Sequence, residues 1–336
     1  MTRRRVLMGG ASALGWLTAQ RTAWAQGAGR LPRVARVVLD VPQAEMLGPD
    51  PSNPAARAFV HQLRDLGWVA GRNVVIEQRT AEGRPERVPA LLRELLELPV
   101  NVIVATGGTI TRLARQATDA IPIVAIGPDL VGMGLAAHLA RPGGNVTGVN
   151  FQVGPALGTK RMELLKRAVP AARRVAVIRP RRTPGQPMWD PATIEAARTL
   201  GLVLSAIPVD SPADLDSALA ELSRNRHDAL WGADTPVIIA NRGRIVEHAS
   251  RARLPSIFGL RLFADAGALM SYGANLADAE RRAATYVDKI LKGARPGDLP
   301  IDQPTRFEFV INQKTADALS LRLPQALLLQ ADEVIR

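Results

Sequence analysis

VIVATGGTITRLA, residues 102–114, is the stretch around which the rest of this chain can be interpreted. Its first four residues are apolar and mostly β-branched, which predicts a buried parallel strand, whereas the spacing from Ile110 onward is helical. Between them lies a turn that suits glycine, which lacks a Cβ and adopts positive φ; it comprises Thr106, Gly107, Gly108 and Thr109. Such a turn directs free N–H groups and a positive helix dipole at one spot, which suits a carboxylate. A loop that binds nothing fits the same residues.

Strand-like and helix-like segments alternate on both sides of this stretch. We expect strands over residues 34–41, 74–76, 102–105, 121–126, 146–149, 175–178, 202–207, 229–231, 256–258 and 268–272. Helices are expected over 55–66, 85–98, 109–118, 127–139, 157–169, 192–200, 213–222 and 236–252. This alternation predicts an α/β protein with two Rossmann-like, doubly wound lobes. A tail with a helix over 277–292 and a strand over 307–311 is too short for a third domain and must complete the two sheets.

The composition is that of a folded protein whose 336 residues suffice for two domains. Hydrophobic residues make up 47% of the chain and charged residues 22%. The net charge is +12, but four of the arginines precede residue 26 and the other charges are mixed along the chain. Because no nucleic-acid-binding signature accompanies them, a basic surface is expected and a nucleic-acid partner is not.

Residues 1–25 have the pattern of an export signal. Three arginines at positions 3–5 precede a weakly apolar stretch, and Ala23-Trp24-Ala25 is typical of a cleavage site. The apolar stretch is shorter than the roughly 20 residues that span a bilayer. Both the twin-arginine route and the general secretory route fit this segment. The chain has no cysteine, which excludes a disulfide framework and a lipidated N-terminal cysteine. We therefore expect a periplasmic protein that is not lipidated.

Several ordered segments carry a resemblance to a known family. They are DLGWVAGRNV at 65–74, AEG at 81–83, ARPGGNVTG at 140–148, LMSYG at 269–273, ILKGA at 290–294, DLP at 298–300, FEFVIN at 307–312 and ADEVI at 331–335. In this order they resemble periplasmic substrate-binding proteins of ABC transporters, of the family that includes tryptophan- and tyrosine-binding members. The resemblance covers nearly all of the chain after the export signal.

The resemblance implies the class I periplasmic-binding fold, in which two lobes trap a ligand in the cleft between them. It implies one lobe of residues 31–149 plus 274–300 and a second of 150–273 plus 301–336, with chain crossovers near Asn150, Gly273 and Ile301. It also implies a small, amino-acid-like, carboxylate-bearing ligand, permease and ATPase subunits as partners, and a monomer. The cleft residues that it implies are Asp40, Gln43, Glu82, Thr106, Gly107, Gly108, Thr109, Asp129, Arg179, Asp234, Phe258 and Tyr272.

Several of these residues also have a plain structural interpretation. Asp129 and Asp234 follow strands in different lobes, where they could recognise an amine or a hydroxyl, or could cap helices. Arg179 could bind a carboxylate or lie on a solvated rim. Phe258 and Tyr272 end strands and could stack on a ring, whereas core packing is the better interpretation for Trp231. The Glu82 side chain could simply cap the following helix.

Enzymatic functions find little support in the sequence. The four histidines, at positions 61, 138, 227 and 248, have no metal-ligand spacing. No nucleophile elbow, phosphate-binding loop or dinucleotide fingerprint is present. We therefore expect no enzymatic activity, no cofactor and no metal. An exported sensor that presents its ligand to a membrane receptor fits the sequence as an alternative, and an exported enzyme fits it less well.

Overall fold

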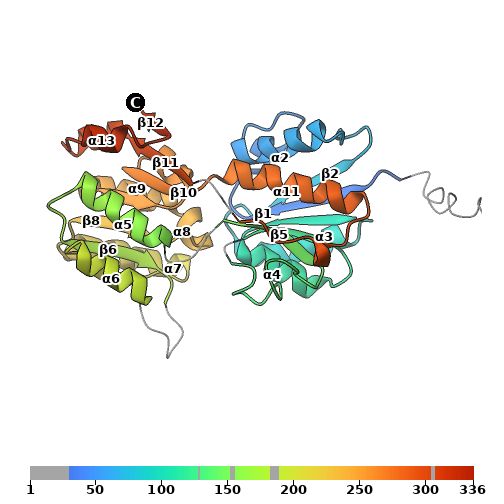
Figure 1. Ribbon diagram of the computed structural model, residues 1–336, viewed down its shortest axis with the longest axis horizontal. Coiled ribbons are helices and arrows are strands. Elements are labelled where there is room, and N and C mark those ends of the chain that lie inside the picture. Colours follow the sequence, from blue (N-terminus) through green and yellow to red (C-terminus); the bar gives the residue numbers. More distant parts are fainter. Residues whose placement is uncertain (1–29, 128, 152–155, 182–188, 304–306) are drawn as a thin grey trace, which may run out of the picture. The chain divides into compact units, whose positions relative to one another are not determined.

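The computed structural model of this chain describes residues 30–127, 129–151, 156–181, 189–303 and 307–336. Within these residues, strands and helices alternate and build two separate β-sheets (Figure 1). The predicted export signal, residues 1–25, lies outside the described part of the chain.

The first sheet has five strands in the order β2-β1-β3-β4-β5, all parallel. They are β1 (Arg33–Val38), β2 (Val75–Thr80), β3 (Val102–Thr106), β4 (Ile123–Gly127) and β5 (Val146–Asn150). From β1 the chain adds β2 on one side and β3, β4 and β5 on the other, so the order of the strands reverses beside β1. In open α/β sheets, ligands bind at the carboxyl ends of the strands beside such a point.

Side chains alternate between the two faces of the first sheet, as the two-residue period of a strand requires. The odd-numbered residues of β1, β3 and β4 pack against α3 (Val88–Leu96) and α4 (Gly108–Ala117). The even-numbered apolar residues of β3 and β4 pack against α2 (Pro54–Asp65) and α11 (Leu276–Leu291). Figure 1 shows α2 and α11 side by side on this second face. Both faces of the sheet are therefore covered, which explains its continuous apolar strands.

The second sheet has seven strands in the order β12-β11-β10-β9-β8-β6-β7. They are β6 (Arg174–Arg179), β7 (Val203–Pro208), β8 (Ala229–Gly232), β9 (Ser256–Phe258), β10 (Met270–Ala274), β11 (Phe307–Asn312) and β12 (Glu333–Ile335). Strands β6 to β10 repeat the order of the first sheet, and only the β10–β11 pairing is antiparallel. The two-lobed α/β class predicted from the sequence is confirmed.

Helices also cover both faces of the second sheet. One face packs against α5 (Ala156–Ala168), α6 (Pro191–Thr199), α12 (Gln313–Ala318) and α13 (Gln325–Leu328). The other packs against α7 (Pro212–Arg224), α8 (Pro236–Ala240), α9 (Arg242–Arg251) and α10 (Arg261–Asp265). Ser211 is the N-cap of α7 and forms a capping box with Asp214.

Two predicted helices differ in the structure. Residues 129–139 form turns, because Gly134 adopts a φ of +70° and the Asp129 side chain accepts a hydrogen bond from Gly132 N. The helix expected over 236–252 divides into α8 and α9 at Asn241, whose side-chain amide donates to Val237 O at 2.8 Å. The sequence patterns did not predict the short elements α1 (Gln43–Met46), α10, α13, β12 and the 3₁₀ turn η2 (Pro296–Asp298). The helix expected over 85–98 begins as the 3₁₀ turn η1 (Pro85–Arg87) and continues as α3.

The chain passes between the sheets three times. It leaves the first sheet after β5, returns from β10 to α11, and leaves again after η2 to form β11. The segment after η2 lies beside β5, where Asp302 N donates to Gly148 O and Asn150 N donates to Asp302 O. The exact residues at which the lobes divide stay a prediction.

Gly148 explains part of the ARPGGNVTG segment that carried the resemblance. It lies in the middle of β5 with a φ of +140°, and a Cβ there would overlap the backbone carbonyl of Ala125 on β4. Only glycine avoids both the strained φ and the overlap. The β4–β5 pairing therefore depends on this position.

Candidate ligand-binding site

A cavity of about 630 Å³ is lined by residues that follow the carboxyl ends of strands in both sheets. The first sheet contributes residues that follow β3, β4 and β5, and the second contributes residues that follow β6 and β8, together with α5 and α6. This volume lies in the range of small-molecule sites, which are about 300–1,000 Å³. The cavity therefore lies where the topology of both sheets favours a ligand.

The wall from the first sheet is built around the turn that opens α4. Gly107 has a φ of +106° and donates its N–H to Ile126 O at 2.7 Å, and no side chain caps the first turn of α4. The first N–H groups of a helix lack intrahelical acceptors and carry the positive end of its dipole. The exposed side chains of Arg112 on α4 and Asp129 after β4 lie on the same wall. This wall thus offers both a place for an anion and a carboxylate.

A buried ion pair forms part of the wall from the second sheet. Arg161 on α5 is 7% exposed and Asp234 after β8 is 1% exposed, with 3.0 Å between Nη2 and Oδ2. Arg161 Nε also donates to Tyr272 O at 2.8 Å, and Asp234 Oδ1 accepts from Gly259 N at 3.0 Å. A Cβ at position 259 would overlap both charged groups, so glycine there leaves the space that the pair occupies.

Aromatic side chains supply much of the apolar surface of the cavity. The guanidinium of Arg179 lies 4.8 Å from the ring centre of Trp189, a cation–π arrangement. Trp231 and Phe151 also line the cavity. Trp231 Nε1 and Thr235 Oγ1 are buried and have no hydrogen-bond partner among the described residues. A buried polar atom without a partner is costly, so these two atoms suit a polar group of a ligand.

Six of the twelve predicted site residues line this cavity together: Gly107, Gly108, Thr109, Asp129, Arg179 and Asp234. They lie at or directly after the carboxyl ends of β3, β4, β6 and β8, as the carboxyl-end rule for parallel strands predicts. Ligand contact by these residues stays a prediction.

The other six predicted residues lie outside the lining, and their contacts explain why. Thr106 Oγ1 donates to Glu280 and Gln43 Nε2 donates to Gln78 O. The exposed Glu82 pairs with Arg84 and Arg87, and the hydrogen bond from Arg87 lowers the pKa of the Glu82 carboxyl.

Aromatic packing and burial account for the remaining three. Phe258 is fully buried and stacks on Phe263, with 4.1 Å between ring centres. The Tyr272 ring packs near two phenylalanines of β11, and only its carbonyl oxygen reaches Arg161. Burial raises the pKa of Asp40, partly offset by Arg242, whose Nη1 lies 3.6 Å from Asp40 Oδ2.

Sequence reasoning missed several lining residues. Arg112 could have been predicted, because it lies four positions after Gly108 and therefore on the same face of α4. Arg161 gave no signal, since an arginine in a helix is ordinarily exposed. Trp231 was assigned to the core, whereas its ring lies between the core and the cavity.

The described residues contain neither a helix suited to cross a membrane nor a metal-binding cluster. Among the helices in this part of the chain, none combines the length and apolar character needed to cross a bilayer. The same residues contain no group of three or more His, Asp or Glu side chains that could hold a metal ion.

Two lobes with a cavity lined from both define a protein of the substrate-binding class. The chain belongs to the family of ABC transporter substrate binding proteins, whose family model matches residues 49–335. This finding confirms the resemblance drawn from the sequence segments.

Individual relatives agree with this family. The chain is 23% identical to a tyrosine-binding protein of Clostridioides difficile over 269 residues, which are 80% of this chain and 77% of the relative. A conserved domain protein from Vibrio cholerae superposes with a TM-score of 0.77 at 23% identity, covering 91% of this chain and 100% of the other. The ABC domain from Streptococcus pneumonia in complex with L-Trp gives a TM-score of 0.78 at 20% identity, with the same coverage. At these identities the solved structures show a shared fold.

Proposed function

We propose that this protein is the extracytoplasmic solute-binding component of an ABC importer and that it binds a small, carboxylate-bearing, amino-acid-like ligand between its lobes. The observation that carries the proposal is the cavity, which both sheets line with the uncapped start of α4 on one wall and arginines on both. Its partners would be a small-molecule ligand and the permease and ATPase subunits of the transporter, with the binding protein itself a monomer.

The distribution of charge favours an amino acid over a simple anion. Of the acidic residues in the lining, Asp234 pairs with Arg161, and Asp190 accepts hydrogen bonds from the Thr193 N–H and hydroxyl at 2.9 and 2.7 Å. Asp129 is the exposed carboxylate on the wall of the first sheet. A ligand carboxylate near α4 and a ligand ammonium near Asp129 would complement these charges.

The apolar part of the cavity suits a hydrophobic ligand side chain. Trp189, Trp231 and Phe151 present aromatic surface there, and flat rings pack well against such surface. The tyrosine-binding relative and the neighbour in complex with L-Trp support aromatic amino acids as the first ligands to test.

The decisive experiment identifies the ligand and then removes its carboxylate. Mass spectrometry of small molecules released from the denatured, natively purified protein should find a carboxylic acid. Calorimetry should then show binding of L-tryptophan or L-tyrosine and at least about 100-fold weaker binding of tryptamine and tyramine, because a charge-assisted hydrogen bond contributes about 1.5–3 kcal/mol and two are lost. A released ligand without an acidic group, or amines that bind as tightly as the amino acids, would contradict the proposal.

Export is tested separately. When the gene is expressed in a Gram-negative host, the N-terminus of the mature protein should be Gln26, the residue after Ala23-Trp24-Ala25. Full-length protein confined to the cytoplasm of a cell with working export would rule out the periplasmic location.

A further inference from the structure

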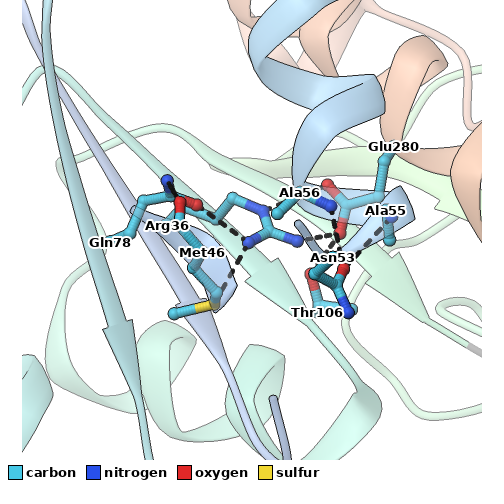
Figure 2. A network of polar contacts seen from close by, with 8 residues as sticks. All are labelled: Arg36, Met46, Asn53, Ala55, Ala56, Gln78, Thr106 and Glu280. Atoms are coloured by element: carbon cyan, nitrogen blue, oxygen red, sulfur yellow. Dashed lines mark hydrogen bonds and ion pairs between the residues drawn. The ribbon is translucent and has the colours of Figure 1, made fainter. Parts of the chain in front are cut away.

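A polar network joins Arg36, Gln78 and Glu280 to Thr106, the residue before the turn that opens α4 (Figure 2). Arg36 on β1 is 1% exposed and Glu280 on α11 is fully buried, and they form two hydrogen bonds, at 2.6 Å (Nη2 to Oε1) and 3.2 Å (Nε to Oε2). Arg36 Nη1 also donates to Gln78 Oε1 at 3.1 Å. The network joins the two neighbouring strands β1 and β2 to helix α11.

Thr106 extends this network to the cavity wall. It is the last residue of β3, and its hydroxyl donates to Glu280 Oε1 at 3.1 Å. The next residue, Gly107, begins the turn whose following residues line the cavity. Glu280 Oε1 therefore accepts bonds from both Arg36 and the residue that immediately precedes the turn.

Hydrogen bonds hold the turn, in which Gly107 N donates to Ile126 O at 2.7 Å. Gly107 tolerates many backbone conformations, so its geometry depends on what holds the residues on either side. On the α4 side, Thr111 Oγ1 donates to Gly107 O at 2.9 Å. On the β3 side, the side-chain anchors are the Thr106–Glu280 bond, at 3.1 Å, and a longer bond from Thr111 Oγ1 to Ala105 O, at 3.4 Å.

We propose that Glu280 and Thr106 are positioning residues that hold the ligand-contacting turn in place without touching the ligand. The expected effect of these residues on ligand affinity rests on the proposed function. Their effect on the geometry of the turn does not depend on any ligand. Helix α11 begins at Leu276, directly after the chain returns from β10, so the same carboxylate links the turn to a crossover between the sheets.

The test uses Thr106→Val, because Glu280→Gln would leave Arg36 buried without its counter-charge and could prevent folding. Thr106→Ser keeps the hydroxyl and serves as the rescue variant. Thr147→Val is the matched control: Thr147 lies on β5 of the same sheet, is fully buried, and its hydroxyl donates to Leu299 O at 2.8 Å, away from the turn.

The first measurement is hydrogen exchange of the Gly107 and Thr111 amides by NMR, without added ligand. Both amides are hydrogen-bonded, to Ile126 O and Gly107 O. The Gly107 and Thr111 amides should exchange at least about tenfold faster in Thr106→Val than in the wild type. In Thr106→Ser and Thr147→Val they should exchange at rates near those of the wild type. Wild-type rates in Thr106→Val would overturn the proposal.

The second measurement is calorimetry with L-tryptophan as the probe. Thr106→Val should bind it about tenfold more weakly, and the rescue and control variants should bind it like the wild type. Faster exchange with unchanged affinity would overturn the positioning role. If the wild type itself does not bind L-tryptophan, the choice of ligand fails, and the exchange rates alone decide whether Thr106 holds the turn.

Discussion

Breaking the Arg161–Asp234 ion pair should destabilise the protein strongly. Removing one member of a buried pair costs about 3–5 kcal/mol, because the other charge is left without a partner in a medium of low dielectric. Both side chains are nearly inaccessible, at 7% and 1% exposure. Asp234→Asn retains an acceptor for Gly259 N but leaves the guanidinium without a counter-charge. Arg161→Met removes the guanidinium from beside the Asp234 carboxylate.

The variant that lacks both charges tests whether the two single losses of stability share one cause. With both charges removed, no uncompensated ion remains, so Arg161→Met with Asp234→Asn should cost less than the two single changes together. The free energy of unfolding is measured by urea denaturation followed by tryptophan fluorescence. The control is Glu195→Gln, which breaks an exposed pair with Arg198, 2.7 Å between Nη2 and Oε1; no measurable change is expected there. Single-variant losses below about 1 kcal/mol, or costs that simply add in the double variant, would refute the argument.

Three further outcomes are expected. Gly148→Ala should lower the free energy of unfolding by more than about 3 kcal/mol, whereas Gly144→Ala, which meets no neighbouring atom, should change it by less than about 0.5 kcal/mol in the same urea assay. Thr109→Ala should weaken L-tryptophan binding about tenfold in calorimetry, and unchanged affinity would move the anion site away from α4. Burial, and then the Asp302 carboxylate, raise the pKa of Tyr286 to about 12 from 10.0. The unfolded chain therefore loses this proton first, so stability that is complete below about pH 10 falls as the pH rises toward 12, and Tyr286→Phe should abolish this fall in urea titrations.

The segment around β3 shows what local sequence can predict. The apolar run, the Gly-Gly turn and the helical spacing are all local features, and the structure has strand, turn and helix within one or two residues of the predicted positions. The direction of the Thr106 side chain cannot be predicted in this way. It is determined by Glu280, which lies 174 residues away in the chain, and no local pattern carries that information.

The second-sheet wall of the cavity shows the same limit. Asp234 was identified because it follows a strand, and the structure places it in the lining. Its partner Arg161 could not be identified, because its burial depends on the space left by Gly259, which follows β9, and by Gly273, which lies in β10. Neither glycine is near Arg161 in sequence, so the pairing becomes visible only when the sheet is assembled.

The return of the chain to the first sheet also affects how the protein is made. The face of β1, β3 and β4 that α11 covers is synthesised early, but α11 ends only at Leu291. The stretch from Asn150 to Leu291 takes roughly 7–28 s to translate at about 5–20 residues per second. During that interval the nascent chain carries an apolar sheet face with only α2 to cover it. The first lobe, although most of it leaves the ribosome first, can be completed only after β6 to β10 of the second sheet have been synthesised.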